Sequence, residues 1–191
     1  MSIFKEAFER SIDCKQACIE QGFNVLQEIG EVISASMSKG GKLMLCGNGG
    51  SAADAQHLAA ELLVRLRPSV NRIPLPAISL ALDTSTITAC ANDFSFEELY
   101  ARSVYALSKE DDCLLCISTS GNSENVFRAL EAAREKKVHA FAFLGNGGGK
   151  CLDACDLAFV VPSDNTASIQ EAHIVAGHAL MEFIEVSVCE L

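Results

Sequence analysis

Five short apolar runs, each bounded by turn residues, constrain the fold more than any other feature of the sequence. Runs of this length without polar alternation are typical of strands buried on both faces of a parallel sheet. The segments between them place apolar residues at helical spacing, and alternating strands and helices predict an α/β sandwich with a mostly parallel, five-stranded sheet. The expected strands are residues 42–46, 76–82, 113–117, 139–144 and 157–161.

Helical patterns also flank the expected sheet at both ends. Residues 3–38 place apolar side chains at helical spacing with a break near Gly22, which predicts two N-terminal helices. A last long helix is expected from about residue 167 to residue 189. With 191 residues and 49% hydrophobic composition, the chain is expected to form a single domain over residues 1–191. Its N-terminal helices would occupy 1–40, and the sheet core and C-terminal helix 41–191.

Charge and cysteine content argue against several partners and locations. The formal net charge is -10 and lysines and arginines do not cluster, so no nucleic-acid partner is expected. The N-terminus mixes charged and apolar residues unlike a signal peptide, and the apolar runs fall short of the roughly 20 residues of a membrane span, so no membrane partner is expected. The nine cysteines are an odd number, and a strand would point Cys113 and Cys116 to opposite faces. Free thiols and a cytoplasmic location are therefore predicted.

A glycine-rich segment, GNGGSA at residues 47–52, follows the first expected strand and opens a helix. It satisfies the GxGxxG/A fingerprint of dinucleotide-binding folds. The acid that binds the ribose in such folds should follow about 20 residues later, where this chain has Arg72. Binding of NAD is therefore disfavoured. A tight turn without a ligand would explain the glycines but not the neighbouring Ser51.

A second turn, STSGNS at residues 118–123, follows the third expected strand and precedes a helix that begins near Glu124. Ser123 alone could be a helix N-cap. Four hydroxyls in six residues, with Gly121 permitting unusual backbone angles, exceed what capping requires. Hydroxyls and backbone N–H groups at a helix N-terminus bind phosphate without lysine, which suits an acidic chain. This turn therefore predicts a phosphate site.

A histidine and a carboxylate share one face of the helix that follows the glycine-rich segment. His57 and Glu61 are four residues apart, so their side chains lie one turn above the other. They are either an ordinary polar pair on a solvated face or ligands of a divalent metal such as zinc. Their position two turns beyond the glycine-rich segment favours a role beside a ligand held there.

The C-terminal segment QEAHIVAGH offers further polar groups without selecting a pair. Helical geometry aligns Glu171 with His178 and leaves Gln170 about 12 Å from His178 along the helix axis. His173 in the same segment fits a structural role equally well. The spacing alone therefore does not decide which of these residues act together.

Four motifs together resemble the phosphoheptose isomerases of the sugar isomerase (SIS) domain superfamily. They are GNGGSAADAQH, the Asn92–Asp93 pair in CANDFSFE, ISTSGNSENV and IQEAHIVAGH, and they follow the family's order and approximate spacing over nearly the whole chain. Four separate motifs are far more specific than the glycine-rich segment alone. The resemblance implies a three-layer αβα fold. It also implies a homotetramer with active sites at subunit interfaces, in which the N-terminal helices serve oligomerisation.

An enzymatic activity follows from the same resemblance. The family interconverts D-sedoheptulose 7-phosphate and D-glycero-D-manno-heptose 7-phosphate through a cis-enediol. This is the first step toward the ADP-heptose or GDP-heptose used for lipopolysaccharide core or capsule. Such an isomerisation needs a base near the carbon that loses its proton and an acid–base group near the two oxygens. One zinc ion per subunit is the implied cofactor.

The resemblance assigns roles to individual residues of this chain. The implied catalytic pair is Glu61 and His178. Ser168 stands where family members carry arginine before the IQE segment, which puts the role of that arginine in doubt here. The implied zinc ligands are His57, Glu61, Gln170 and His178. The implied substrate contacts are Asn48, Gly49, Gly50, Ser51, Glu61, Asn92, Asp93 and Gln170, with Ser118, Thr119, Ser120 and Ser123 on the phosphate.

Two other functional classes compete with an isomerase. Non-catalytic SIS proteins that bind a phosphosugar or associate with the replication initiator DnaA share the GNG and IST motifs. A binding protein, however, has no need of both Glu61 and His178. An NAD-dependent oxidoreductase is disfavoured by the missing ribose-binding acid. The retained pair therefore favours the isomerase.

Overall fold

The computed structural model describes residues 2–189, and within them it contains one five-stranded sheet in the order β2-β1-β3-β4-β5. Every pair of neighbouring strands runs parallel, which confirms the expected sheet. The second strand is shorter than its apolar run because only three of its residues pair with β1. The strands are β1 (Leu43–Gly47), β2 (Ala77–Ser79), β3 (Cys113–Ser118), β4 (His139–Leu144) and β5 (Leu157–Val160).

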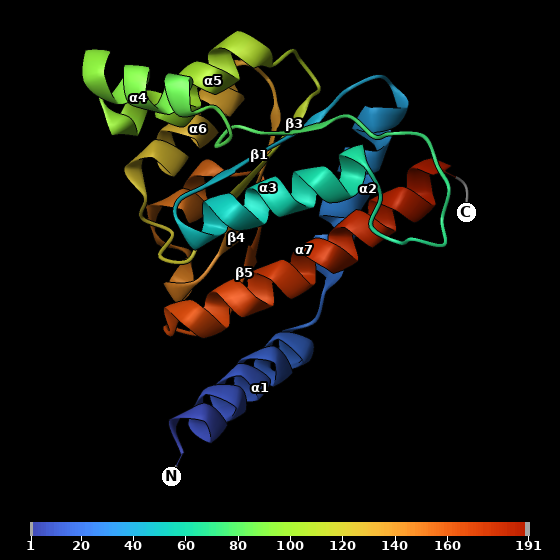
Figure 1. The fold of residues 1–191 in the computed structure, drawn as a ribbon, viewed down its shortest axis with the longest axis vertical. Helices are drawn as coiled ribbons and strands as arrows, with labels where there is room; N and C mark the ends of the chain where they lie inside the picture. The colour runs from blue at the N-terminus through green and yellow to red at the C-terminus, as the bar shows by residue number, and fades with distance from the viewer. Residues whose placement is uncertain (1, 190–191) are drawn as a thin grey trace.

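Helices cover both faces of the sheet, so the fold is the expected three-layer αβα sandwich (Figure 1). One face packs against α2, α3 and α7, and the other against α5 and α6. A short helix, α4, and two 3-10 segments, η1 and η2, complete the connections. The bounds are α2 (Asn24–Ser38), α3 (Gly50–Leu63), α4 (Thr84–Asp93), η1 (Phe96–Glu98), α5 (Leu99–Leu107), α6 (Glu124–Glu135), η2 (Asn146–Ala154) and α7 (Thr166–Cys189).

Side chains alternate between the two cores along each strand. Cys113 packs in the core with α2, α3 and α7, whereas Cys116 packs in the core with α5 and α6, as their spacing predicted. On β4, Phe141 and Phe143 fill the first core, and the intervening alanines face the second. All nine cysteines are free thiols. The apolar strand pattern of the sequence therefore reflects burial on both faces.

The last helix, α7, is the most apolar helix that the described residues contain. By length and composition alone it passes for a membrane span, with a mean hydropathy of 1.3 over an 18-residue window. In the fold it lies against α1 (Ile3–Gln21), α2 and α3 (Figure 1). Its residues Ile169, Leu180 and Ile184 are buried in the first core. This position between other helices accounts for its composition.

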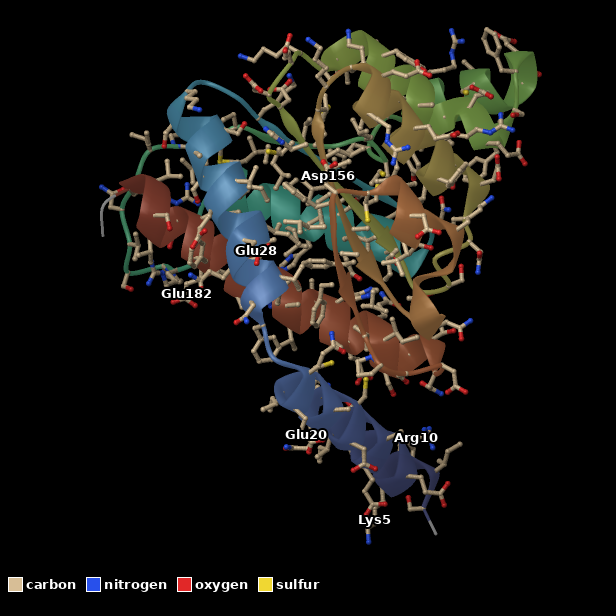
Figure 2. The ribbon with its side chains drawn as sticks, turned by 180° about the vertical axis from the view of Figure 1, so that it is seen from behind. Lys5, Arg10, Glu20, Glu28, Asp156 and Glu182 are labelled. Carbon is tan, nitrogen blue, oxygen red and sulfur yellow. The ribbon has the colours of Figure 1, made fainter. Side chains whose placement is uncertain are left out.

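The first helix, α1 (Ile3–Gln21), extends away from the sandwich (Figures 1 and 2). Its inner side is attached to α7, where the Cys14 thiol donates to the carbonyl of Ser168 at 3.7 Å. Within the described residues, its larger apolar side chains are exposed, with Phe4 at 77% and Phe8 at 73%. The helical spacing of these residues predicted the helix correctly. It could not show that one apolar face would lie outside the core.

One histidine of α7 is completely buried. His173 has no exposed surface, its Nε2 lies 3.0 Å from the carbonyl oxygen of Leu144, and its Nδ1 has no hydrogen-bond partner among residues 2–189. Because a carbonyl only accepts, Nε2 carries the proton and the imidazole is neutral. Burial lowers the pKa of this imidazole to about 4, although its bond to Leu144 opposes the shift. The structural role that the sequence left open for His173 is the one observed.

The folded protein should lose stability in mild acid because of His173. Its pKa falls from 6.5 to about 4 on folding, so between these values the unfolded chain binds a proton that the folded chain does not. Stability from this residue is complete above pH 6.5 and should fall by about 2 kcal/mol between pH 7.5 and pH 5.

Urea unfolding at both pH values tests this expectation in the wild type and in His173→Gln, whose amide donates in place of Nε2 but does not titrate. Between pH 7.5 and pH 5, the free energy of unfolding should fall more in the wild type than in His173→Gln. His139→Gln, at a half-buried position at the start of β4, should behave as the wild type does. An equal loss in the wild type and His173→Gln would contradict the assignment.

Candidate functional site

Two loops meet at the carboxyl edge of the sheet, where the strand order reverses. We call residues 47–52 the glycine loop and residues 118–123 the serine loop. Strand β1 pairs with β2 on one side and with β3 on the other, and Gly47 lies in register with Ile117. The two loops therefore leave neighbouring strands at the same edge. In open α/β sheets, ligands bind in the crevice at this reversal of strand order.

A reciprocal pair of amide hydrogen bonds joins the two sides of this crevice. Asn48 of the glycine loop donates to Asn125 of α6 at 2.8 Å, and Asn125 donates back at 2.9 Å. Asn125 is buried and lies two residues beyond the serine loop. The side chain of Asn48 is thus held toward the serine loop. Ser51 is also buried, and its backbone N–H donates to the carbonyl of Asn48 at 3.0 Å.

The serine loop leaves the N-terminus of α6 without a side-chain cap. Ser123 occupies the N-cap position but makes no capping hydrogen bond, and its hydroxyl lies 3.2 Å from that of Ser118. The simple N-cap role is therefore not observed. Gly49 likewise gives α3 no side-chain cap. Two helix N-termini with uncapped N–H groups beside hydroxyls are a suitable site for an anion.

The first residue of α6, Glu124, is a carboxylate beside this anion site. Its oxygens accept from Lys150 and from Arg128. Hydrogen bonds from Lys150 first, and from Arg128 second, hold the pKa of this carboxyl below its ordinary value. Glu124 is therefore ionised and paired with cations, which limits its repulsion of an anion at the helix start.

A third glycine-rich segment, in η2, supports the serine loop, and the sequence interpretation missed it. Gly121 has a φ of +64°, and a Cβ there would lie 2.0 Å from the carbonyl oxygen of Gly148. The backbone N–H of Cys151 donates to the Gly121 carbonyl at 3.0 Å. Only glycine permits this approach. Three consecutive glycines directly after the fourth strand were the signal that could have identified the segment.

Three side chains from α3 and α7 converge near these loops. The Nε2 atom of His57 lies 2.7 Å from Nε2 of His178 and 3.4 Å from a carboxylate oxygen of Glu61. One ligand atom from each residue lies within 4.8 Å of the other two. We call these residues the His–Glu–His cluster. The side chain of Glu61 is 17% exposed, so His57 and Glu61 are not simply a pair on a solvated face.

Close packing of α7 on α3 brings His178 to the cluster. A Cβ on Gly177 would lie 2.6 Å from the side chain of Leu58, so the missing side chain lets Leu58 pack directly against α7. His178 follows Gly177 directly, and Leu58 follows His57. The contact between the two helices therefore places the two imidazoles together.

The cluster is chemically able to hold a metal ion. Two imidazoles and one carboxylate are a common donor set of catalytic metal centres that leave one position open. Donor atoms around a tetrahedral ion lie about 3.3 Å apart when the bonds are about 2 Å long. Two of the observed separations, 2.7 Å and 3.4 Å, lie on either side of this value, and the third, between Glu61 and His178, is within 4.8 Å. The residues present thus fit a metal.

The side chain of Gln170, on α7, lies beside Gly50 at the start of α3. A Cβ on Gly50 would be 2.3 Å from its amide nitrogen, and its side chain hydrogen-bonds Asp54. Its eight-residue separation from His178 corresponds to about 12 Å along the axis of α7. The structure therefore brings three of the four expected metal ligands together and places Gln170 beside the glycine loop.

Asp54 is a site residue that the sequence interpretation missed. It is buried one turn before His57, and one of its carboxylate oxygens has no partner among the described residues. Burial raises the pKa of this carboxyl, while the hydrogen bond from Gln170 and the charges of His57 and His178 oppose the shift. Its position three residues before His57 was the available signal, because residues three apart share a helix face.

Glu171 and Ser168 both form hydrogen bonds with side chains outside the His–Glu–His cluster. Although Glu171 is aligned with His178 by helical spacing, its carboxylate accepts from Ser11 and from Lys15 of α1. The backbone N–H and the hydroxyl of Ser168 both donate to the side chain of Asn165, at 3.0 Å and 3.2 Å. The side chain of Asn165 therefore caps the first turn of α7, and the Ser168 hydroxyl adds a second bond to it.

Asn92 and Asp93 lie at the end of α4, exposed to solvent. The amide of Asn92 donates to the carboxylate of Asp93 at 2.7 Å. Asp93 lines a cavity of about 720 Å³ between α4 and α5. Within residues 2–189, no hydrogen bond joins this pair to the two loops or to the His–Glu–His cluster.

The remaining expected contacts, Thr119 and Ser120, lie in the serine loop, where the Ser120 hydroxyl accepts from the backbone of Asn122 at 3.2 Å.

Comparison with known proteins places these features in a family. The SIS domain family model matches residues 8–145. A phosphoheptose isomerase of Rhodospirillum rubrum is 47% identical over 184 residues, covering 96% of this chain and 93% of the relative. The chain belongs to the phosphoheptose isomerase family of SIS-domain proteins. The loops and the cluster described above are thus features of a phosphoheptose isomerase fold.

Solved structures of two family members superpose closely. The phosphoheptose isomerase GmhA from Neisseria gonorrhoeae has a TM-score of 0.89 at 38% identity, covering 95% of this chain and 96% of that one. The phosphoheptose isomerase from Francisella tularensis has a TM-score of 0.91 at 38% identity, covering 95% of each chain. The resemblance seen in the four motifs is confirmed over nearly the full length.

Removing one donor should weaken metal binding at the cluster. We expect His57→Ala to lower the affinity for Co²⁺ by more than about tenfold, because one of three converging donors is lost. Calorimetric titration and the visible absorption of bound Co²⁺ measure this. His139→Ala, which alters a histidine outside the cluster, should bind as the wild type does. Equal binding by His57→Ala and the wild type would show that the cluster is not the metal site.

Proposed function

We propose that this chain interconverts D-sedoheptulose 7-phosphate and D-glycero-D-manno-heptose 7-phosphate. The observation that carries the proposal is the His–Glu–His cluster, which is formed by α3, the helix that follows the glycine loop, and by α7, in a chain related to phosphoheptose isomerases over nearly its whole length. The cluster supplies acid–base groups, and the loops supply an anion site. An aldose–ketose isomerase of a sugar phosphate requires both.

The phosphate is assigned to the serine loop and the N-terminus of α6. Ser118, Thr119, Ser120 and Ser123 supply hydroxyls, and the uncapped first turn supplies N–H groups. The chain carries a net charge of -10, which repels a phosphate. The hydroxyls and N–H groups of this site must therefore attract the phosphate against that repulsion. The sugar is assigned to the glycine loop residues Asn48, Gly49, Gly50 and Ser51, with Gln170.

Glu61 and His178 are assigned the proton transfers. One of them removes the proton from the carbon beside the carbonyl, and the electron pair moves toward the carbonyl oxygen to form the cis-enediol. The other acts on the two oxygens, so that a proton leaves the hydroxyl and one reaches the former carbonyl. Returning the first proton to the neighbouring carbon completes the exchange. Both residues belong to one cluster on facing helices, as such a shared task requires.

The assigned cofactor is one zinc ion per subunit, held by His57, Glu61 and His178. Bound zinc supplies Lewis acidity toward the substrate's carbonyl and hydroxyl oxygens. Gln170 is assigned to both metal and substrate by family resemblance. Its contacts with Gly50 and Asp54 favour the substrate role within its own subunit.

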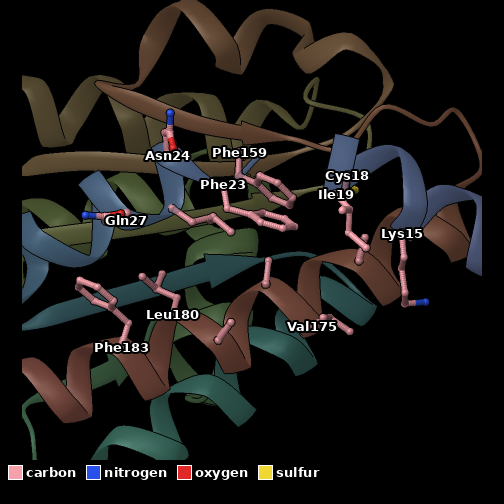
Figure 3. Close-up of a pocket in the computed structure, with 14 residues that line it drawn as sticks. Lys15, Cys18, Ile19, Phe23, Asn24, Gln27, Phe159, Val175, Leu180 and Phe183 are labelled. Carbon is pink, nitrogen blue, oxygen red and sulfur yellow. The ribbon is translucent and has the colours of Figure 1, made fainter. Parts of the chain in front are cut away.

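The assigned assembly is a homotetramer with active sites at subunit interfaces. The exposed apolar face of α1 and an apolar groove of about 780 Å³ between α1, α2 and α7 support this assignment (Figure 3). Phe23, Phe159, Leu180 and Phe183 line the groove. The separation of Asn92 and Asp93 from the loops of their own subunit also suits a site completed by a neighbouring subunit. The single SIS domain then uses residues 1–40 for oligomerisation.

The biological setting is proposed from family membership. The reaction would take place in the cytoplasm and would supply heptose precursors for lipopolysaccharide core or capsule. No nucleic acid or membrane is needed for it. If the wild type forms no aldose from sedoheptulose 7-phosphate, a phosphosugar-binding or DnaA-associating role would replace this proposal.

Replacing Glu61 by glutamine should abolish turnover without loss of folding. The amide has nearly the same shape but cannot accept a proton from carbon, so kcat should fall by at least about 100-fold. Binding of sedoheptulose 7-phosphate, measured by calorimetry, should remain because the serine loop is unchanged. Glu182→Gln, a change at an exposed position of α7, is the control and should retain activity. Near-normal turnover by Glu61→Gln would refute the assignment.

Placing a charge on the apolar face of α1 should disrupt the tetramer. Phe8 is 73% exposed in the isolated chain, and a carboxylate there would oppose burial against another subunit. We expect Phe8→Glu to elute as a smaller species than the wild type in size-exclusion chromatography with light scattering. Lys5→Glu alters charge on the same helix and should remain assembled. A monomeric wild type would contradict the assembly.

A further inference from the structure

A buried arginine closes the end of the helix that carries Glu61. The side chain of Arg72 is 1% exposed and belongs to the segment between α3 and β2. Its guanidinium donates to the carbonyl of Glu61 at 2.7 Å and to that of Leu62 at 2.9 Å. It also donates to the carbonyl of Ile73 at 2.8 Å. Arg72 thus binds two of the carbonyls that the end of α3 leaves without helical partners.

The same guanidinium binds a buried carboxylate of α7. Nε of Arg72 donates to Glu185 at 2.6 Å, and the side chain of Glu185 has no exposed surface. Its other oxygen accepts from Nε of Arg67 at 2.8 Å. Burial alone would raise the pKa of Glu185, but the bonds from Arg72 and Arg67 outweigh it and keep the pKa below its ordinary value. The carboxylate is therefore ionised, and both of its oxygens are bound.

These contacts connect the two helices that form the His–Glu–His cluster. Glu185 lies seven residues, or about two turns, beyond His178 on the same side of α7. Arg72 binds Glu185 through one nitrogen and the backbone of Glu61 through another. Its contacts thus run from α7 to the end of α3. A cation at the C-terminal end of a helix is also favoured by the helix dipole.

We propose that Arg72 is a positioning residue that fixes Glu61 relative to His178 by binding the end of α3 to Glu185 of α7. The inference rests on the proposed function, because it concerns the geometry of the assigned catalytic pair. A planar guanidinium can bind a carboxylate and two carbonyls at once, whereas a lysine ammonium acts as a point charge. A dinucleotide-binding fold would carry a ribose-binding acid at about this position. In this chain the position is occupied by Arg72, a cation with structural contacts.

Exchange of Arg72 for lysine tests the proposal against a matched control. Arg67→Lys makes the same change on the other oxygen of Glu185, but Arg67 contacts no carbonyl of α3 among the described hydrogen bonds. Both variants should lose some thermal stability. We expect only Arg72→Lys to lower Co²⁺ affinity by roughly tenfold, to alter the Co²⁺ absorption spectrum and to lower kcat with little change in KM.

The Co²⁺ measurements do not depend on turnover, so they separate this proposal from the proposed activity. An inactive wild type would count against the activity alone, and the Co²⁺ spectrum would still report the geometry of the cluster. Co²⁺ affinity and spectrum that are equal in Arg72→Lys and Arg67→Lys would overturn the positioning role. If Arg72→Lys does not fold, Glu185→Gln takes its place and should show a several-fold loss of Co²⁺ affinity. Wild-type affinity in that variant would also overturn the proposal.

Discussion

The parallel pairing of β1 with β3 is the contact on which the rest of the site depends. These strands are separated by about 70 residues of sequence, yet their register places Gly47 beside Ile117. The glycine loop and the serine loop therefore emerge together, and the helices that follow them begin at the same edge. Each loop alone would be an ordinary turn. Their juxtaposition creates a crevice lined by backbone N–H groups and hydroxyls in a chain with too much negative charge to bind phosphate by its overall field.

Features with a local physical cause could be predicted from the sequence. Strands buried on both faces require continuous apolar runs, and residues four apart on a helix must share a face, so the sheet and the pairing of His57 with Glu61 followed directly. The three glycines after β4 had an equally local signal, which was overlooked. The serine loop was recognised because its hydroxyls exceed the needs of a single N-cap.

Features that depend on the contact between distant elements could not be predicted in this way. His178 meets His57 because α7 packs on α3, where Gly177 lies against the side chain of Leu58. The burial of Asp54 and the contacts of Arg72 depend on the same packing, which periodicity does not describe. For Asn92 and Asp93 the family motif predicts a contact that one subunit does not provide. Both lie on α4, and among the described residues no hydrogen bond joins them to the loops.

The position of α7 after all five strands has a consequence for synthesis of the protein. All five strands and both loops precede Thr166, so the ribosome produces them before the last helix exists. Until α7 emerges, the sheet face that it covers, including Phe141 and Phe143, lacks part of its apolar cover. The first core can therefore reach its native packing only after α7 has been synthesised. A chain that stops short of α7 would expose aggregation-prone apolar surface, which chaperones and proteases recognise.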